Sequence, residues 1–222
     1  MDKIKLIVVG ESKVGKTSLI NQYIEHTFDS DITFTITSDK YEKIIKLDNN
    51  EELKIEIWDT VGQEKYKVIN NIFIKNSKIA LLVYDITNRN SFEQIDYWHK
   101  TIKDLNPFEV IFGVVANKID LYKKQIISKE EGENYAKSIN ALFFETSSME
   151  YDSINQVFIE ISNAYLKNIA ERESIINKGT EIEKIKKIKE ENEIDDIISH
   201  DSVQLMKGDK KNSNCHCRYF CI

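Results

Sequence analysis

An eight-residue segment near the N-terminus, GESKVGKT (10–17), has the residue types and spacing of a phosphate-binding loop. Its two glycines let backbone N–H groups surround phosphate oxygens without interference from a Cβ atom. The Lys16 ammonium can bridge the β- and γ-phosphates of a nucleotide, and the Thr17 hydroxyl can ligate Mg²⁺. By itself the loop indicates a nucleotide hydrolase or a kinase. The predicted binding residues are Gly10, Glu11, Ser12, Lys13, Val14, Gly15, Lys16, Thr17 and Ser18.

A second motif, NKID (117–120), follows an apolar run and can recognise a base. The Asp120 carboxylate can accept hydrogen bonds from guanine N1–H and from the guanine 2-amino group. Adenine lacks both donors, so such a site discriminates between the two bases by roughly 10⁴–10⁵-fold. The segment ETSS (145–148) ends the next apolar run and can offer a backbone N–H to guanine O6. The predicted base-site residues are Asn117, Lys118, Asp120, Ser147, Ser148 and Met149.

The elements that must position these motifs follow from hydrophobic periodicity. Continuous apolar runs of strand length occur at 4–10, 79–85, 110–117 and 142–147, which is typical of parallel strands buried on both faces. Helical periodicity occurs between these runs, for example at 17–24 and 91–105, and a last helix is predicted to begin near Ser153.

Two further features complete the predicted fold. Alternating segments on both sides of DNN (48–50) predict an antiparallel hairpin. Capping-box pairs, Ser91 with Gln94 and Ser128 with Glu131, predict two helix starts. We expect an α/β, doubly wound, mostly parallel six-stranded sheet with one antiparallel edge strand and about five helices.

Composition limits the class of protein. The 222 residues carry a net charge of −6, which argues against nucleic acid as a main partner. The N-terminus lacks the pattern of a signal peptide, and the longest apolar runs are far shorter than the ~20 residues that span a bilayer. We therefore expect a cytosolic chain. Because the composition becomes highly charged after Arg172, we predict a folded domain over 1–172 and a variable tail over 173–222.

A third motif, WDTVGQE (58–64), completes a recognisable set. With the phosphate loop and NKID, it resembles the small GTPases of the Ras superfamily, and most closely the Rab family. The resemblance covers about residues 3–170, and KIEIWDTVGQE, LLVYDIT and SFEQIDYW are its more Rab-like stretches. It implies a P-loop GTPase fold and a GTP/GDP switch that acts in vesicle traffic.

The resemblance also implies roles for individual residues. Thr17 and Thr35 would ligate Mg²⁺, and Asp59 would hold it through water. Gly62 would donate its backbone N–H to the γ-phosphate, and Gln63 would orient the attacking water. Turnover would be slow alone, and an arginine from a partner could accelerate it roughly 10³–10⁵-fold. Bound GTP would order two loops that hydrolysis releases.

Several residues depart from the family pattern or bear on its recognition surfaces. Phe28 would lie against the guanine ring as in the family, and we interpret Trp58 as a packed core residue. Lys40 and Thr37 replace an aromatic residue and a glycine, Val61 replaces an alanine, and Met149 replaces a lysine. Exchange factors, activating proteins and effectors are expected to bind residues 35–45 and 60–75.

All three cysteines, Cys215, Cys217 and Cys221, lie in the last eight residues. The resemblance implies lipid attachment there, which would hold the chain on the cytosolic face of an internal membrane and require an escort for prenylated proteins. One attached lipid binds a protein to a membrane only marginally, whereas two lipids, or one lipid with nearby lysines, bind it stably. Zinc binding with His216, a disulfide, or cysteines without a role are the alternatives.

The leading hypothesis is thus a membrane-anchored Rab-type GTPase. One alternative is a GTP-binding scaffold with slow or absent cycling, because Thr37 and Val61 alter two loops of the site. Another is a Ras-superfamily signalling GTPase outside traffic. A P-loop kinase is less consistent with the sequence, since NKID and WDTVGQE have no role in such an enzyme.

Overall fold

The computed structural model describes residues 3–28, 40–47, 52–60, 73–106 and 109–175. Residues 3–168 of this set belong to one unit, and 169–175 belong to a second unit, Ile169–Ile222. No helix in these described ranges has the length and apolar character needed to cross a membrane. The predictions for Thr35, Thr37, Val61, Gly62, Gln63 and the three C-terminal cysteines concern residues outside the described ranges.

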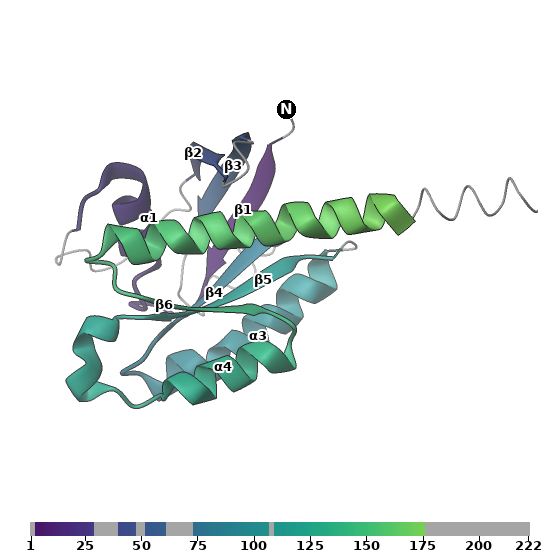
Figure 1. The fold of residues 1–222 in the computed structure, drawn as a ribbon. Helices are drawn as coiled ribbons and strands as arrows, with labels where there is room; N and C mark the ends of the chain where they lie inside the picture. The colour runs from purple at the N-terminus through teal and green to yellow at the C-terminus, as the bar shows by residue number, and fades with distance from the viewer. Residues whose placement is uncertain (1–2, 29–39, 48–51, 61–72, 107–108, 176–222) are drawn as a thin grey trace, which may run out of the picture. The chain divides into compact units, whose positions relative to one another are not determined.

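A six-stranded sheet in the order β2-β3-β1-β4-β5-β6 forms the centre of the first unit (Figure 1). β2 pairs with β3 in antiparallel register, and the other neighbouring strands are parallel. The predicted sheet, with its single antiparallel edge, is confirmed. The strands are β1 (Ile4–Val9), β2 (Lys40–Lys46), β3 (Glu52–Asp59), β4 (Ile79–Asp85), β5 (Ile111–Asn117) and β6 (Leu142–Thr146).

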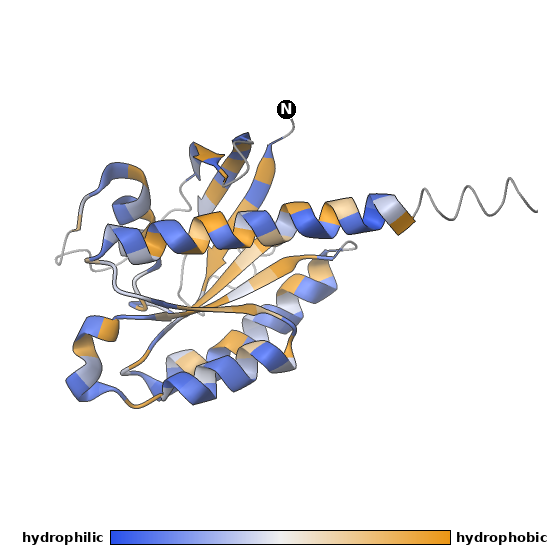
Figure 2. Ribbon diagram, viewed as in Figure 1, coloured by the Kyte–Doolittle hydropathy of each residue, from blue (hydrophilic) through white to orange (hydrophobic). Residues whose placement is uncertain are grey.

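Helices cover both faces of this sheet, as expected for a doubly wound fold (Figure 1). α3 and α4 pack on one face, whereas α1 and the helix that begins at residue 151 pack on the other. The central strands are mostly hydrophobic, whereas the helices carry both hydrophilic and hydrophobic residues (Figure 2). The described helices are α1 (Lys16–Glu25), α3 (Arg89–Leu105), the 3-10 helix η2 (Ile119–Lys124), α4 (Lys129–Ser138) and residues 151–175.

The strand β4 explains why a continuous apolar run predicts a central strand. Its odd-numbered residues 79, 81 and 83 join the core under α1, and its even-numbered residues 80, 82 and 84 join the core under α3. Successive strand side chains point to opposite faces, so a strand covered on both sides needs apolar residues throughout. Every residue of β4 is buried.

The two predicted helix starts had different outcomes. α4 begins after Ser128, whose side chain accepts a hydrogen bond from the Glu131 N–H, so that prediction is confirmed. The predicted cap at Ser91 is wrong, because α3 begins after Asn88, which accepts from the Ser91 N–H. The buried Ser91 hydroxyl instead donates to the Asn88 carbonyl and accepts from the Asp85 N–H. It thereby joins the end of β4 to the first turn of α3.

Trp58 packs against the core under α3 but is only half-buried. Its Nε1–H donates to Glu56 Oε1 at 2.7 Å, and the Lys5 ammonium lies 4.6 Å from its ring centroid. Trp58 is therefore a core residue only on the side of its ring that packs against the core under α3.

Candidate nucleotide-binding site

The turn between β1 and α1 depends on two glycines. Gly10 has φ +150° and Gly15 has φ +95°, which are backbone conformations that residues with a Cβ rarely adopt. A Cβ at Gly10 would lie 2.2 Å from the Val83 carbonyl oxygen, and one at Gly15 would lie 2.5 Å from Asn117 Nδ2. The loop can therefore keep this shape only with glycine at both positions, and the resulting concave backbone fits a phosphate group.

Lys16 is the first residue of α1, and its side chain is buried. Its ammonium donates to the carbonyls of Gly10 at 3.0 Å and Glu11 at 2.8 Å, so it lies across the concave side of the loop. Burial lowers the pKa of Lys16 to about 8, although the negative charges of Asp59 and Glu11 oppose this shift. A phosphate beside it would supply the negative charge that favours the ammonium form.

Thr17 and Asp59 bring two hard oxygen donors together from distant parts of the chain. The Thr17 hydroxyl donates to Asp59 Oδ2 at 2.6 Å, and the Asp59 carboxylate at the end of β3 is fully buried. The next residue, Thr60, is fixed by a hydrogen bond from its hydroxyl to the Val8 carbonyl.

This donor pair fits Mg²⁺, which is usually bound by one or two carboxylates together with nucleotide phosphates. Among the described residues, no group of three or more His, Cys, Asp or Glu side chains could hold a metal alone.

Asn117 connects the phosphate loop to the end of β6. Its buried Nδ2 donates to the Val14 carbonyl at 2.8 Å and to Ser148 Oγ at 3.1 Å. Its Oδ1 accepts from the Thr146 hydroxyl at 3.1 Å. The hydrogen bonds of Asn117 thus fix the position of the phosphate loop relative to the end of β6.

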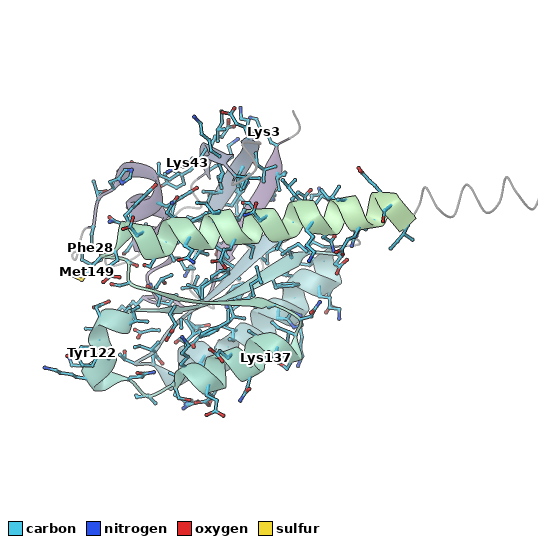
Figure 3. The ribbon with its side chains drawn as sticks, in the orientation of Figure 1. Lys3, Phe28, Lys43, Tyr122, Lys137 and Met149 are labelled. Atoms are coloured by element: carbon cyan, nitrogen blue, oxygen red, sulfur yellow. The ribbon has the colours of Figure 1, made fainter. Side chains whose placement is uncertain are left out.

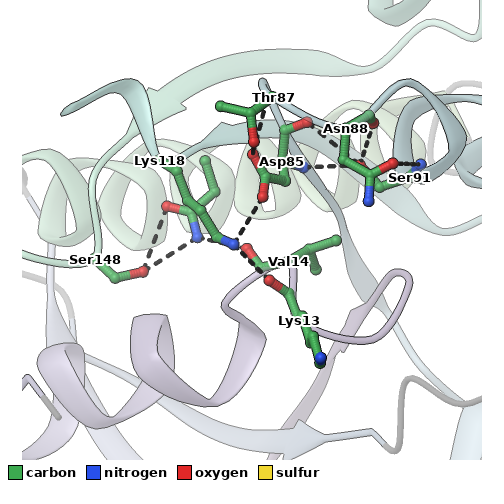
Figure 4. Close-up of polar contacts among 9 residues, drawn as sticks. Lys13, Val14, Asp85, Thr87, Asn88, Ser91, Lys118 and Ser148 are labelled. Atoms are coloured by element: carbon green, nitrogen blue, oxygen red, sulfur yellow. Dashed lines mark hydrogen bonds and ion pairs between the residues drawn. The ribbon is translucent and has the colours of Figure 1, made fainter. Parts of the chain in front are cut away.

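Lys118 provides a second connection to the loop. It adopts a left-handed conformation with φ +65°, and its ammonium donates to the Lys13 carbonyl at 2.6 Å and pairs with Asp85 Oδ2 at 2.7 Å (Figure 4). Asp85 is not among the residues that the sequence motifs predicted. The signal that could have identified it is its place at the carboxyl end of β4, beside the residues that it supports.

The base-recognition residues lie at the ends of β5 and β6. Asp120 Oδ1 accepts a hydrogen bond of 2.6 Å from the Ser147 hydroxyl, which in turn accepts from the Met149 N–H at 3.3 Å. Phe28 and Met149 are large apolar residues that remain 43% and 58% exposed and lie at the same edge in this view (Figure 3). Exposed apolar groups beside converging polar groups are typical of a site for a flat, partly polar ligand.

The structure thus gathers most of the predicted site residues at the carboxyl ends of β1, β3, β5 and β6. Glu11 and Ser12 lie in the phosphate loop, and Ser18 lies in the first turn of α1. A mostly parallel doubly wound sheet with a glycine-rich phosphate loop after its first strand defines a P-loop nucleotide-binding protein.

Comparison with known proteins identifies the family. The Ras family model matches residues 5–167. Ras-related protein RabQ of Dictyostelium discoideum is 36% identical over 177 residues, covering 80% of this chain and 83% of that protein. GTP-binding protein ypt5 of Schizosaccharomyces pombe is 35% identical over 159 residues, covering 71% and 75%. The chain belongs to the Ras family and, within it, to the Rab small GTPases.

Membership of this family establishes the general function. The chain is a Rab-type small GTPase, a GTP/GDP-regulated switch of membrane traffic, and the non-cycling scaffold is not favoured. GTPase activity, binding of GTP and GDP with Mg²⁺, and interaction with regulators or effectors are general properties of this family.

Proposed function

We propose that this chain binds GTP and GDP through a site that Asn117 holds together, and that it hydrolyses GTP slowly on its own. The observation that supports the proposal best is the pair of hydrogen bonds from Asn117 Nδ2 to Val14 and Ser148. They join the phosphate loop to the segment after β6, so a nucleotide bound across both segments would contact two parts of the chain that are held together.

The phosphate end would be held by the backbone N–H groups of residues 10–15 and by Lys16. Lys16 already lies across the loop with two of its three ammonium hydrogens donated to backbone carbonyls, so an arriving phosphate would accept the third. Thr17, Asp59 and Thr35 would hold Mg²⁺, which neutralises charge on the β- and γ-phosphate oxygens when bound. Asp59 acts from the buried end of β3, where the Thr17 hydroxyl fixes its orientation.

The base end would recognise guanine through Asp120, which Ser147 orients, and through the backbone N–H of Ser148. Phe28 and Met149 would cover the faces of the base, because both are exposed apolar groups near these polar residues. Lys118 would support the frame by its contacts with Lys13 and Asp85.

Hydrolysis is assigned from the family motif. Gln63 would orient the attacking water, and Thr35 and Gly62 would contact the γ-phosphate. Such chemistry consists mainly of positioning and charge stabilisation, so turnover would be slow until a partner supplies an arginine. Effectors, an exchange factor and an activating protein would bind residues 35–45 and 60–75.

Membrane attachment is the last part of the proposal. A tail over 173–222 would follow the domain over 1–172 and carry lipid on Cys215, Cys217 or Cys221. The lipid would place the chain on the cytosolic face of an internal membrane, and an escort for prenylated proteins would deliver it there.

The experiment that tests the base assignment is the substitution Asp120→Asn. An asparagine amide N–H donates where the carboxylate accepts, so it should reject the guanine 2-amino group and donate a hydrogen bond to the 2-carbonyl of xanthine. We expect GDP affinity to fall by at least about 100-fold and XDP affinity to rise. An equal loss of affinity for GDP and XDP, in a variant whose thermal unfolding is unchanged, would contradict the assignment.

Two controls complete this test. ATP should not compete with GTP for the wild-type protein, because adenine offers Asp120 neither donor. Single-turnover hydrolysis should be faster in wild type than in Gln63→Leu, and equal rates would contradict the role of Gln63.

A further inference from the structure

Met149 is an exposed apolar residue beside the predicted base site. It is 58% exposed, and it directly follows two serines that contact the base-site residues. Ser147 donates to Asp120, and Ser148 contacts Asn117. The Met149 N–H donates to the same Ser147 hydroxyl, so its backbone lies within two hydrogen bonds of the Asp120 carboxylate.

The surroundings of Met149 suggest what covers it when the site is filled. Phe28, which would also face the base, is likewise apolar and 43% exposed. Both side chains reach the same edge of the molecule in Figure 3. A purine ring between them would bury both, and the polarisable thioether packs well against an aromatic face.

We infer that Met149 is a reversible oxidation site that controls how fast this protein releases guanine nucleotide. The inference rests on the proposed base site and adds a modification to it. The reactants are the Met149 thioether and a peroxide. The sulfur attacks one peroxide oxygen, the O–O bond breaks and an S–O bond forms. The sulfur is oxidised to a sulfoxide by two electrons, and hydrogen peroxide is reduced to water.

The sulfoxide changes the face that meets the base. A flexible apolar group becomes a polar one, so the packing against the ring is lost while the polar contacts of Asp120 and Asn117 remain. Loss of a sulfur–aromatic contact corresponds to a roughly two- to tenfold faster release of GDP.

The sequence provides a sharp control. The chain has three methionines, Met1, Met149 and Met206, and its three cysteines all lie at the C-terminus. The variant Met149→Leu keeps every other oxidisable sulfur and a side chain of similar volume. A response to peroxide that is present in wild type and absent in this variant must therefore arise at Met149.

The experiment uses the full chain loaded with a fluorescent GDP analogue, with and without hydrogen peroxide. We expect peroxide to accelerate release roughly two- to tenfold in wild type, to leave Met149→Leu unchanged, and to be reversed by methionine sulfoxide reductases. Equal responses of the two proteins would overturn the inference. So would complete conversion of Met149 to sulfoxide without any change in release.

A second readout tests the placement of Met149 without measuring release. The rate of sulfoxide formation, followed by the mass of the peptide that contains Met149, should be lower with bound GDP than in nucleotide-free protein. Equal rates would show that the base does not cover the sulfur. If the chain failed to bind the GDP analogue at the outset, the proposed function would fail instead, so the two failures are distinguishable.

Discussion

The buried ammonium of Lys16 predicts how nucleotide binding depends on pH. In the free protein, burial lowers the pKa of Lys16 from 10.5 to about 8. The unfolded chain therefore binds more protons than the folded chain between about pH 8 and 10.5, and this group makes the free energy of unfolding rise with pH there. A bound phosphate reverses the shift, because it favours the ammonium. Above pH 8, binding must therefore take up a proton.

The expected change of GDP affinity with pH follows from this pKa. The fraction of free protein with a charged Lys16 falls between pH 7.5 and 8.5, so GDP affinity should weaken about threefold over that range. At pH 8.5 binding should take up roughly three-quarters of a proton. Titration calorimetry in two buffers of different ionisation enthalpy measures that uptake directly, and a fluorescent GDP analogue gives the affinity.

The control for this prediction is Lys16→Arg, because a guanidinium stays charged over the whole range. Its GDP affinity should be lower than that of wild type and almost independent of pH. If wild-type protein took up no proton at pH 8.5, the ammonium would not be buried as the structure describes, and the reasoning would be refuted whatever the variant does.

Three further predictions concern stability, each measured by urea unfolding at pH 7. Gly132→Ala should lower the free energy of unfolding by about 1–3 kcal/mol, because its Cβ would lie 2.4 Å from the Tyr84 hydroxyl, and an unchanged or higher stability would contradict this contact. Phe158→Ala should cost about 3–5 kcal/mol, since its buried ring stacks on Tyr23 with centroids 3.8 Å apart, and a loss below 1 kcal/mol would contradict that packing. Ser128→Ala should cost about 1 kcal/mol by removing the cap of α4, and a neutral result would argue against the cap.

Most of the fold followed from local patterns. The predicted runs at 79–85 and 110–117 lie within a residue of β4 and β5, because strands buried on both faces must be apolar along their whole length. The phosphate loop was equally predictable, since its shape demands glycine at two fixed positions. The pattern failed at the start of α3, where it predicted a cap at Ser91 but Asn88 caps the helix.

The sequence by itself predicted which residues would contact phosphate and guanine, because those chemical types and spacings leave few other uses. The tertiary structure decided how they support one another. Asn117 donates a hydrogen bond to Val14, which lies 103 residues away in the chain. Lys118 contacts Asp85 and Lys13 only because β1, β4 and β5 are neighbours in the sheet. Hydrophobic periodicity places strands, but it carries no signal for polar contacts between segments so far apart in the chain. Such contacts form only once the strands are ordered side by side.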